Sequence, residues 1–134
     1  MATLEQTYLM TTDLARARRF YEGALGLSAA GVGEQSVSYE TGEGELKIRA
    51  DHDPATLESF NLSQPPDSGR GEGAVYVLRL SEPVDRVHER VADSLTVDGG
   101  ELLTAPRDVP WGERMFLVRS PDGYTFEIRG DEAE

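Results

Sequence analysis

The chain has 134 residues, of which 25 are acidic and 13 are basic, so its formal net charge is -12. This acidity argues against nucleic acid as a partner, because phosphate binding needs a positive surface, and the absence of cysteine excludes disulfides and thiolate chemistry. No apolar run approaches the roughly 18 residues that a membrane span needs, and the N-terminus lacks the basic start of a signal peptide, so we expect one cytoplasmic domain with no membrane partner.

The first part of the chain reads as a strand, a helix and three strands. Residues 4–12 are rich in strand-forming side chains. Asp13 then offers an N-cap carboxylate to a helix over residues 14–25, whose apolar positions recur with helical spacing. Three short strands are predicted next, with Gly42 and Gly44 in the last turn, over residues 29–32, 35–40 and 45–50.

A long connection follows over residues 51–73, rich in proline, glycine and serine, with one helical turn expected near residues 55–60. The pattern then starts again. A strand is predicted over residues 74–80 and a helix from about Pro83 to Leu95, which carries a stripe of valines. Strands follow over residues 101–104, 114–119 and 124–129.

The two halves therefore share one order of elements, and their ends also agree in sequence. The Ile-Arg-Ala-Asp of residues 48–51 is echoed by the Ile-Arg-Gly-Asp of residues 128–131, and the second half carries an extra loop at 106–112. Such a repeat predicts two like modules packed about a pseudo-twofold axis within one domain. Module one is expected at about residues 4–51, a linker at about 52–72 and module two at about 73–130.

Short motifs occur near the start of the first module and at the end of the second. The first module has Asp-Leu at 13–14, Arg-Phe-Tyr-Glu at 19–22 and Leu-Gly-Leu at 25–27, and the second has Pro-Trp-Gly-Glu-Arg-Met-Phe at 110–116, Ser-Pro-Asp-Gly at 120–123 and Phe-Glu-Ile at 126–128. These motifs resemble the vicinal oxygen chelate superfamily, which includes glyoxalase I, bleomycin-resistance proteins, fosfomycin-resistance enzymes and extradiol dioxygenases. The resemblance implies an α+β fold of two βαβββ modules that form a curled, mixed-sheet cup, and a homodimer. Because this fold hosts isomerases, oxygenases, transferases and pure binders, activity has to be argued from the site.

Alternation along the strands predicts which side chains point into the cup, because every second residue of a strand faces the same way. The residues expected inside alternate with the apolar residues expected to pack under the helices. From module one they are Gln6, Tyr8, Met10, Lys47 and Arg49, and from module two Val75, Val77, Arg79, Thr125, Glu127 and Arg129.

Metal enzymes of the superfamily place ligands at four equivalent points, which the resemblance maps onto Gln6, Lys47, Val75 and Glu127. Gln6 and Glu127 match residue types seen in glyoxalase I, whereas valine has no lone pair and a lysine ammonium repels a cation. A divalent ion needs roughly three protein ligands. A slip of one residue in the first strand would offer Glu5, and a slip of two in the fourth would offer Glu45. We expect no cofactor, and a divalent metal, if one binds, at Gln6 and Glu127.

Lys47 is the lone lysine of the chain. Its positive charge suggests a substitute for the charge that a metal ion supplies elsewhere in the superfamily. It stands at the position equivalent to Glu127 in the other module, so a protonated Lys47 pairs with Glu127 across the cup or with an anionic ligand. Arg49, Arg79 and Arg129 share the predicted face, which favours a carboxylate, phosphate or enolate ligand. The alternative for these long side chains is that they reach solvent and pair with surface acids.

Four other residues are candidates for the site. Trp111, in the extra loop, either stacks on a planar ligand or packs against the loop's prolines. Arg114 either contacts the ligand or anchors the same loop to an acid, and His52 is either a base at the mouth of the cup or a solvated loop residue. Glu127 is the candidate general base.

Three classes of function follow. The first is a small-molecule binder of the bleomycin-resistance type, holding an anionic or planar molecule without a catalytic metal. The second is a metal-dependent, glyoxalase-like isomerase or lyase that uses Gln6 and Glu127, and the third is a non-catalytic interaction or regulatory protein. An extradiol dioxygenase does not fit, because its two-histidine, one-carboxylate iron site cannot be assembled from His52 and His88. The acidity, with twelve arginines and one lysine, indicates either a high-salt cytoplasm or an arginine-biased composition.

Overall fold

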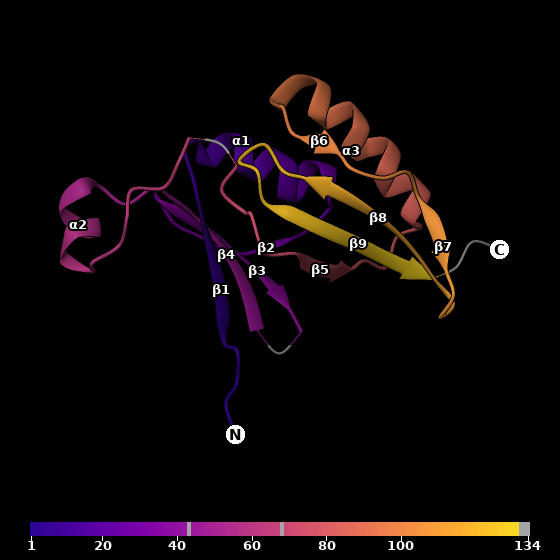
Figure 1. Cartoon of the computed structure of the whole chain (residues 1–134), viewed down its shortest axis with the longest axis horizontal. Coiled ribbons are helices and arrows are strands. Elements are labelled where there is room, and N and C mark those ends of the chain that lie inside the picture. The colour runs from indigo at the N-terminus through magenta and orange to yellow at the C-terminus, as the bar shows by residue number, and fades with distance from the viewer. Residues whose placement is uncertain (43, 68, 132–134) are drawn as a thin grey trace.

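Each half of the chain folds into its own mixed sheet in the computed structural model, which describes residues 1–42, 44–67 and 69–131 (Figure 1). The first sheet has the strand order β1-β4-β3-β2 and consists of β1 (Gln6–Thr11), β2 (Ala29–Val32), β3 (Ser36–Thr41) and β4 (Gly44–Ala50). The second has the order β5-β9-β8-β6, with β7 also paired to β8, and consists of β5 (Tyr76–Arg79), β6 (Glu101–Leu102), β7 (Arg107–Val109), β8 (Glu113–Arg119) and β9 (Thr125–Asp131). The α+β fold of two βαβββ modules is confirmed.

The helices are α1 (Leu14–Arg18), α2 (Pro54–Ser59) and α3 (Val84–Asp98), with a π-helical segment η1 (Arg19–Ala24) directly after α1. The Asp13 carboxylate caps α1 as predicted, since it accepts a hydrogen bond of 3.0 Å from the Arg16 amide. The helix predicted over residues 14–25 is present, but its second half, η1, is π-helical rather than α-helical. There the amide of Leu25 bonds to the carbonyl of Phe20, five residues back, and this wider turn buries both Phe20 and Tyr21.

One other prediction needs correction. The extra loop of the second module contains the short strand β7, which folds back on β8 and which alternation did not reveal because only three residues pair. The turn predicted between β3 and β4 is only partly visible: Gly42 has the positive φ (82°) that favours glycine, and residue 43 lies outside the described residues. Within the described part of the chain, none of the helices is both long enough and apolar enough to cross a membrane.

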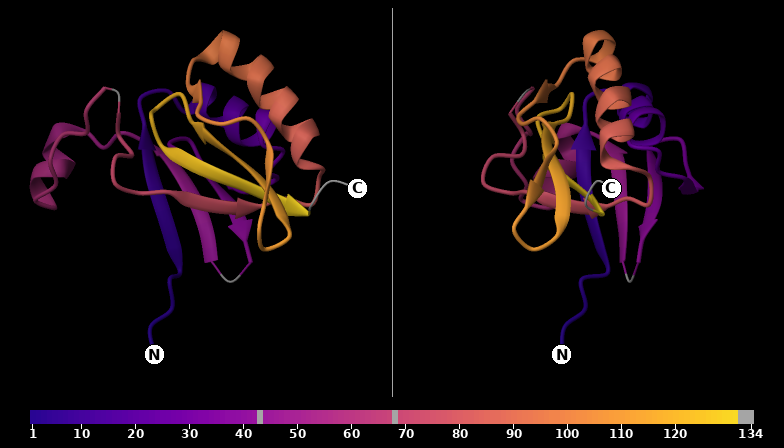
Figure 2. Two further views of the ribbon diagram at one scale, coloured as in Figure 1. Left: turned by 45° about the vertical axis from the view of Figure 1, so that its right-hand side comes forward. Right: turned by 90° about the vertical axis from the view of Figure 1, so that its right-hand side faces the viewer.

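One buried cluster lies between the two sheets and beneath η1 and α3, which run side by side (Figure 2). The ring of Tyr21 joins the two halves, since its centroid lies 5.9 Å from that of Tyr39 in the first sheet and 5.6 Å from that of Phe126 in the second. The core-facing side chains of both sheets therefore converge on the same helices. Because side chains alternate along a strand, the other face of each sheet points away from this core, and the two outward faces point away from each other.

The end of the linker is fixed to the first module by Arg70, whose side chain is 2% exposed. Its guanidinium donates to the Asp51 carboxylate (2.5 and 2.9 Å) and to the carbonyl of Met10 (3.1 Å). Tyr124, from the second module, donates its hydroxyl to the same Met10 carbonyl (2.7 Å). Both modules and the linker thus meet at the end of β1, whereas α2 extends to one side (Figure 1).

Candidate functional site

The first face is the outward side of the first sheet, where the side chains alternate with the buried Leu9, Leu46 and Ile48. Strand register arranges these side chains in three rows across β3, β4 and β1. The rows are Glu40–Glu45–Gln6, Ser38–Lys47–Tyr8 and Ser36–Arg49–Met10. The structure therefore brings together all five module-one residues that alternation predicted for the cup.

Lys47 occupies the middle of this face between two uncharged neighbours, Ser38 and Tyr8. Its ammonium makes no hydrogen bond or ion pair with any other side chain in the described part of the chain. Tyr8 is 46% exposed, so the space in front of the row is open. Ser38 could have been predicted for this face, because alternation along the predicted third strand puts Ser36, Ser38 and Glu40 on the same side.

A row of rings continues from Tyr8 along the same face into the linker. The centroid of His52 lies 6.5 Å from that of Tyr8 and 6.0 Å from that of Phe60, and both contacts are edge-to-face. His52 lies in a loop, as predicted, and its ring is half-buried between two aromatic neighbours. The sequence did not identify Phe60 as a site residue, because the composition of the linker does not show that the residue after its short helix contacts His52.

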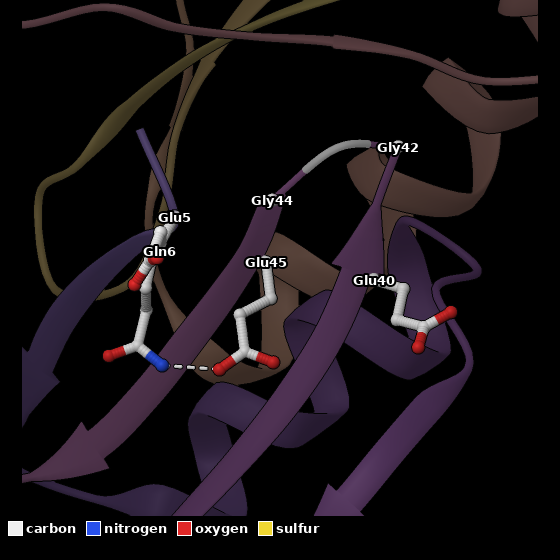
Figure 3. A pocket seen from close by; sticks show the side chains of 6 residues that line it. All are labelled: Glu5, Gln6, Glu40, Gly42, Gly44 and Glu45. Atoms are coloured by element: carbon white, nitrogen blue, oxygen red, sulfur yellow. Dashed lines mark hydrogen bonds between the residues drawn. The ribbon is translucent and has the colours of Figure 1, made fainter. Parts of the chain in front are cut away.

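The acidic end of the first face is a shallow hollow lined by Glu5, Gln6, Glu40 and Glu45 (Figure 3). The Gln6 amide donates to the Glu45 carboxylate, and Glu40 on the next strand points away from this pair. The resemblance mapped ligand positions onto Gln6 and Lys47 in this module, and the register places Gln6 opposite Glu45. The sequence had offered Glu45 only through a two-residue slip, and the observed pairing needs no slip.

The second face is the outward side of the second sheet, and its charges are largely paired with one another. Arg129 donates to Glu127 on the same strand, and this bond raises the pKa of Arg129 above its usual value. Arg79 pairs with Glu113 at 2.8 Å. The other oxygen of Glu113, Oε2, is buried without a hydrogen-bond partner among the described residues, 3.8 Å from the Arg129 Nε. Glu127 is thus part of a network of two arginines and two glutamates.

Two exposed valines complete the second face beside this network. Val77 is the register partner of Glu127 and is 48% exposed, and Val75 is 55% exposed. Neither can ligate a metal. Within one chain the structure does not bring Glu127, Arg129, Arg79 or these valines to Lys47, because the two faces lie on opposite sides of the shared core.

The extra loop separates its two candidates. Trp111 is 63% exposed at the turn between β7 and β8, so its stacking on a ligand stays a prediction. Arg114 binds Asp85 of α3 (2.9 Å) and Asp108 of β7 (3.1 Å), and these bonds raise the pKa of Arg114 and lower that of Asp85. Arg114 is thereby placed as the anchor of the loop, which was the alternative to ligand contact.

The model of the Glyoxalase/Bleomycin resistance protein/Dioxygenase superfamily matches residues 3–128. The chain belongs to this superfamily. A search of curated proteins returned no match. Among solved structures, similarity extends to a glyoxalase-related enzyme from Fulvimarina pelagi (TM-score 0.76, 20% identity, covering 98% of this chain and 89% of that one). It also extends to superfamily proteins from Nocardioides (0.68, 22%, 98% and 84%) and Burkholderia phytofirmans PsJN (0.70, 16%, 98% and 100%). At these identities the likeness establishes the fold alone.

Some members of the glyoxalase superfamily use a metal. Whether this chain can bind one depends on the side chains that could ligate it. The described residues contain no group of three or more histidine, aspartate and glutamate side chains placed to hold a metal ion. Gln6 and Glu45 each carry an oxygen donor, although the contact between them is made by the Gln6 amide nitrogen, and two oxygen donors are one short of the roughly three that a divalent ion needs. Glu127, the acid of the expected set, lies on the other face of the same chain. One chain alone does not fit a catalytic metal.

Proposed function

We propose that this superfamily member binds a small anionic molecule on the first face and does so without a catalytic metal. The observation that supports this is the position of Lys47, a half-buried lysine with no acidic partner among the described residues, on an open sheet face in a chain of net charge -12. Most of the arginines instead pair with acids of the same chain, such as Arg70 with Asp51 and Arg90 with Glu82. A charge-assisted hydrogen bond from Lys47 would then orient a carboxylate or phosphate.

Replacing Lys47 with methionine tests this proposal, because methionine keeps most of the side-chain length and removes the charge. Hydrogen bonds to charged groups contribute about 1.5–3 kcal/mol, so the substitution should weaken anion binding roughly 10- to 100-fold. Calorimetry with acetate, benzoate and inorganic phosphate measures the loss. Arg86→Met is the matched control, since Arg86 is an exposed cation on α3, away from both faces. Equal affinities for the wild type and Lys47→Met would refute the proposal.

We propose further that a second copy of the chain completes the site. The cup that the superfamily resemblance implies needs both faces, and one chain carries them on opposite sides, so two chains would supply one face each. Exposed Val75 and Val77 on the second face provide the apolar surface that such a contact needs.

Light scattering tests this assembly. The wild type should be a dimer and Val77→Glu a monomer, because the new carboxylate would be buried beside Glu127. Val97→Glu, on the exposed side of α3, is the control and should remain dimeric. A monomeric wild type, or loss of the dimer with Val97→Glu alone, contradicts this arrangement.

A second candidate function is a metal-dependent, glyoxalase-like isomerase or lyase. The proximity of Gln6 and Glu45 favours it, since a turn of the Gln6 amide would bring two oxygen donors together, and Glu127 of a partner would raise the number to three. Elemental analysis after equilibration with Zn²⁺, Ni²⁺ or Mn²⁺ separates the two candidates. One tightly held ion per site, lost in Glu45→Gln and retained in Glu40→Gln, would favour the enzyme and count against the metal-free binder.

A further inference from the structure

Three rings form a continuous row on the first face, and two of them come from the linker rather than from the sheet. Tyr8 lies on β1, His52 directly beyond β4 and Phe60 directly beyond α2. Their centroids are separated by 6.5 and 6.0 Å, with interplanar angles of 87° and 70°. Tyr8 is 46% exposed and Phe60 is 60% exposed. Tyr8 and Phe60 are thus each held against His52 while both remain accessible.

The backbone on each side of His52 is fixed, so the row is formed before any ligand arrives. Asp51 is held by the buried guanidinium of Arg70 and by its own amide, which donates to the Thr11 carbonyl at 3.0 Å. Asp53 caps α2 by accepting from the Thr56 amide at 2.8 Å, and this bond lowers the pKa of the Asp53 carboxyl. Leu57 of α2 is 3% exposed and keeps the helix in place. A preformed row loses little conformational entropy on binding.

The row begins beside the unpaired ammonium of the first face. Tyr8 is the register partner of Lys47, and paired residues on neighbouring strands have Cβ atoms about 5 Å apart. The carboxylates nearest in the register, Glu45 and Glu40, belong to the next row, where Glu45 is bonded to Gln6. Charge for an anion and surface for a ring therefore lie within the span of one small molecule.

We infer that the first face selects aromatic anions, that is, a planar ring carrying a carboxylate or a similar acidic group. Lys47 takes the anionic group, and the exposed rings of Tyr8 and Phe60, with His52 between them, take the aromatic part. This inference rests on the proposed function, because it assigns a ligand class to the same site. Aromatic rings favour such partners because edge-to-face and offset contacts add to the simple burial of apolar area.

His52 and Phe60 act here as specificity-determining residues contributed by the linker. The charge that attracts the anion is assigned to Lys47, so the removal of His52 or Phe60 should alter the choice between ligands more than the attraction itself. This separates their role from that of Lys47 and makes it measurable.

The experiment compares benzoate with cyclohexanecarboxylate, which has the same charge and a similar size but no aromatic ring. Calorimetry on the full-length protein should give tighter binding of benzoate, by about five- to tenfold. Phe60→Leu and His52→Leu should remove most of this preference and leave the affinity for cyclohexanecarboxylate nearly unchanged. Leu62→Ala, an exposed change in the same segment, is the control and should preserve the preference.

The possible failures are distinguishable. Equal affinities for the two carboxylates, with both lost in Lys47→Met, would overturn the aromatic selectivity and leave the proposed anion site intact. A benzoate preference that survives in both Phe60→Leu and His52→Leu would overturn the role of the linker rings. Absence of binding for either carboxylate would overturn the inference together with the proposed function.

Discussion

The two outward faces occupy equivalent places in a repeated fold, but they differ in whether their charged side chains are paired with one another. At the centre of the first face Lys47 stands between serine and tyrosine, with no acidic partner among the described residues. At the equivalent place of the second face, Glu127 is bonded to Arg129 within a network that also includes Glu113 and Arg79. The repeat has kept the backbone and changed the side chains, so one face has a charge available to a ligand and the other does not.

The largest expected effect concerns stability, and it tests whether both sheets depend on the same buried side chain. Tyr21 is 2% exposed and contacts the core side of both sheets. Tyr21→Ala should lower the free energy of unfolding by about 3–5 kcal/mol, because large-to-small changes in a core leave a cavity. Urea denaturation followed by circular dichroism measures it. The comparison variant Trp111→Ala removes a 63%-exposed ring and should change stability by no more than about 0.5 kcal/mol. Two separate unfolding transitions in Tyr21→Ala would show that the faces are supported independently.

A smaller effect concerns acid. The core sides of the two sheets should differ in how their contribution to stability depends on pH. In the first sheet the Tyr39 hydroxyl donates to Glu22 at 2.9 Å, and the pKa of the Glu22 carboxyl is lowered first by its bond from Arg18 and then by that from Tyr39. A lowered pKa in the folded state contributes stability above the unfolded-state pKa, and this contribution is lost as the pH falls through the folded-state pKa. Tyr39→Phe should therefore cost about 1 kcal/mol at pH 7 and less in acid.

Unfolding curves measured between pH 3 and pH 7 test this dependence. Tyr124→Phe is the matched control, because its hydroxyl donates to the Met10 carbonyl, which does not titrate. Its cost should stay constant over the same range. A constant cost for Tyr39→Phe as well would show that Glu22 does not contribute to the acid response of the first sheet.

The smallest effect addresses whether the faces meet in an assembly. Glu127→Gln would free the Arg129 guanidinium from its carboxylate partner. If a second copy brings this face to Lys47, anion binding should strengthen about threefold, since another cation would then reach the ligand. Titration of benzoate into the wild type and into Glu127→Gln measures the difference, with Glu101→Gln, at the edge of the second sheet, as the control. Unchanged affinity would indicate that the two faces act separately.

The order of elements and the outward side chains were predictable from the sequence, and the placement of the two faces was not. Alternation identified Lys47 and Glu127 as outward residues because one side of each strand is apolar. That they point in opposite directions depends on Tyr21 and its neighbours packing between the sheets, and local periodicity carries no information on such a contact. The pairing of Gln6 with Glu45 was missed for a similar reason, since register between distant strands depends on the packing of the whole sheet.

The fixed side chain of Arg70 has an evolutionary consequence. It secures the end of the linker to Asp51 and Met10, so the stretch between these anchors can change in length and composition while both sheets stay in place. Phe60 lies within that stretch and His52 at its start, and both contribute rings to the first face. Insertions and substitutions there would give descendants of this chain new ligand preferences on an unaltered scaffold, and specificity could diverge faster than the fold.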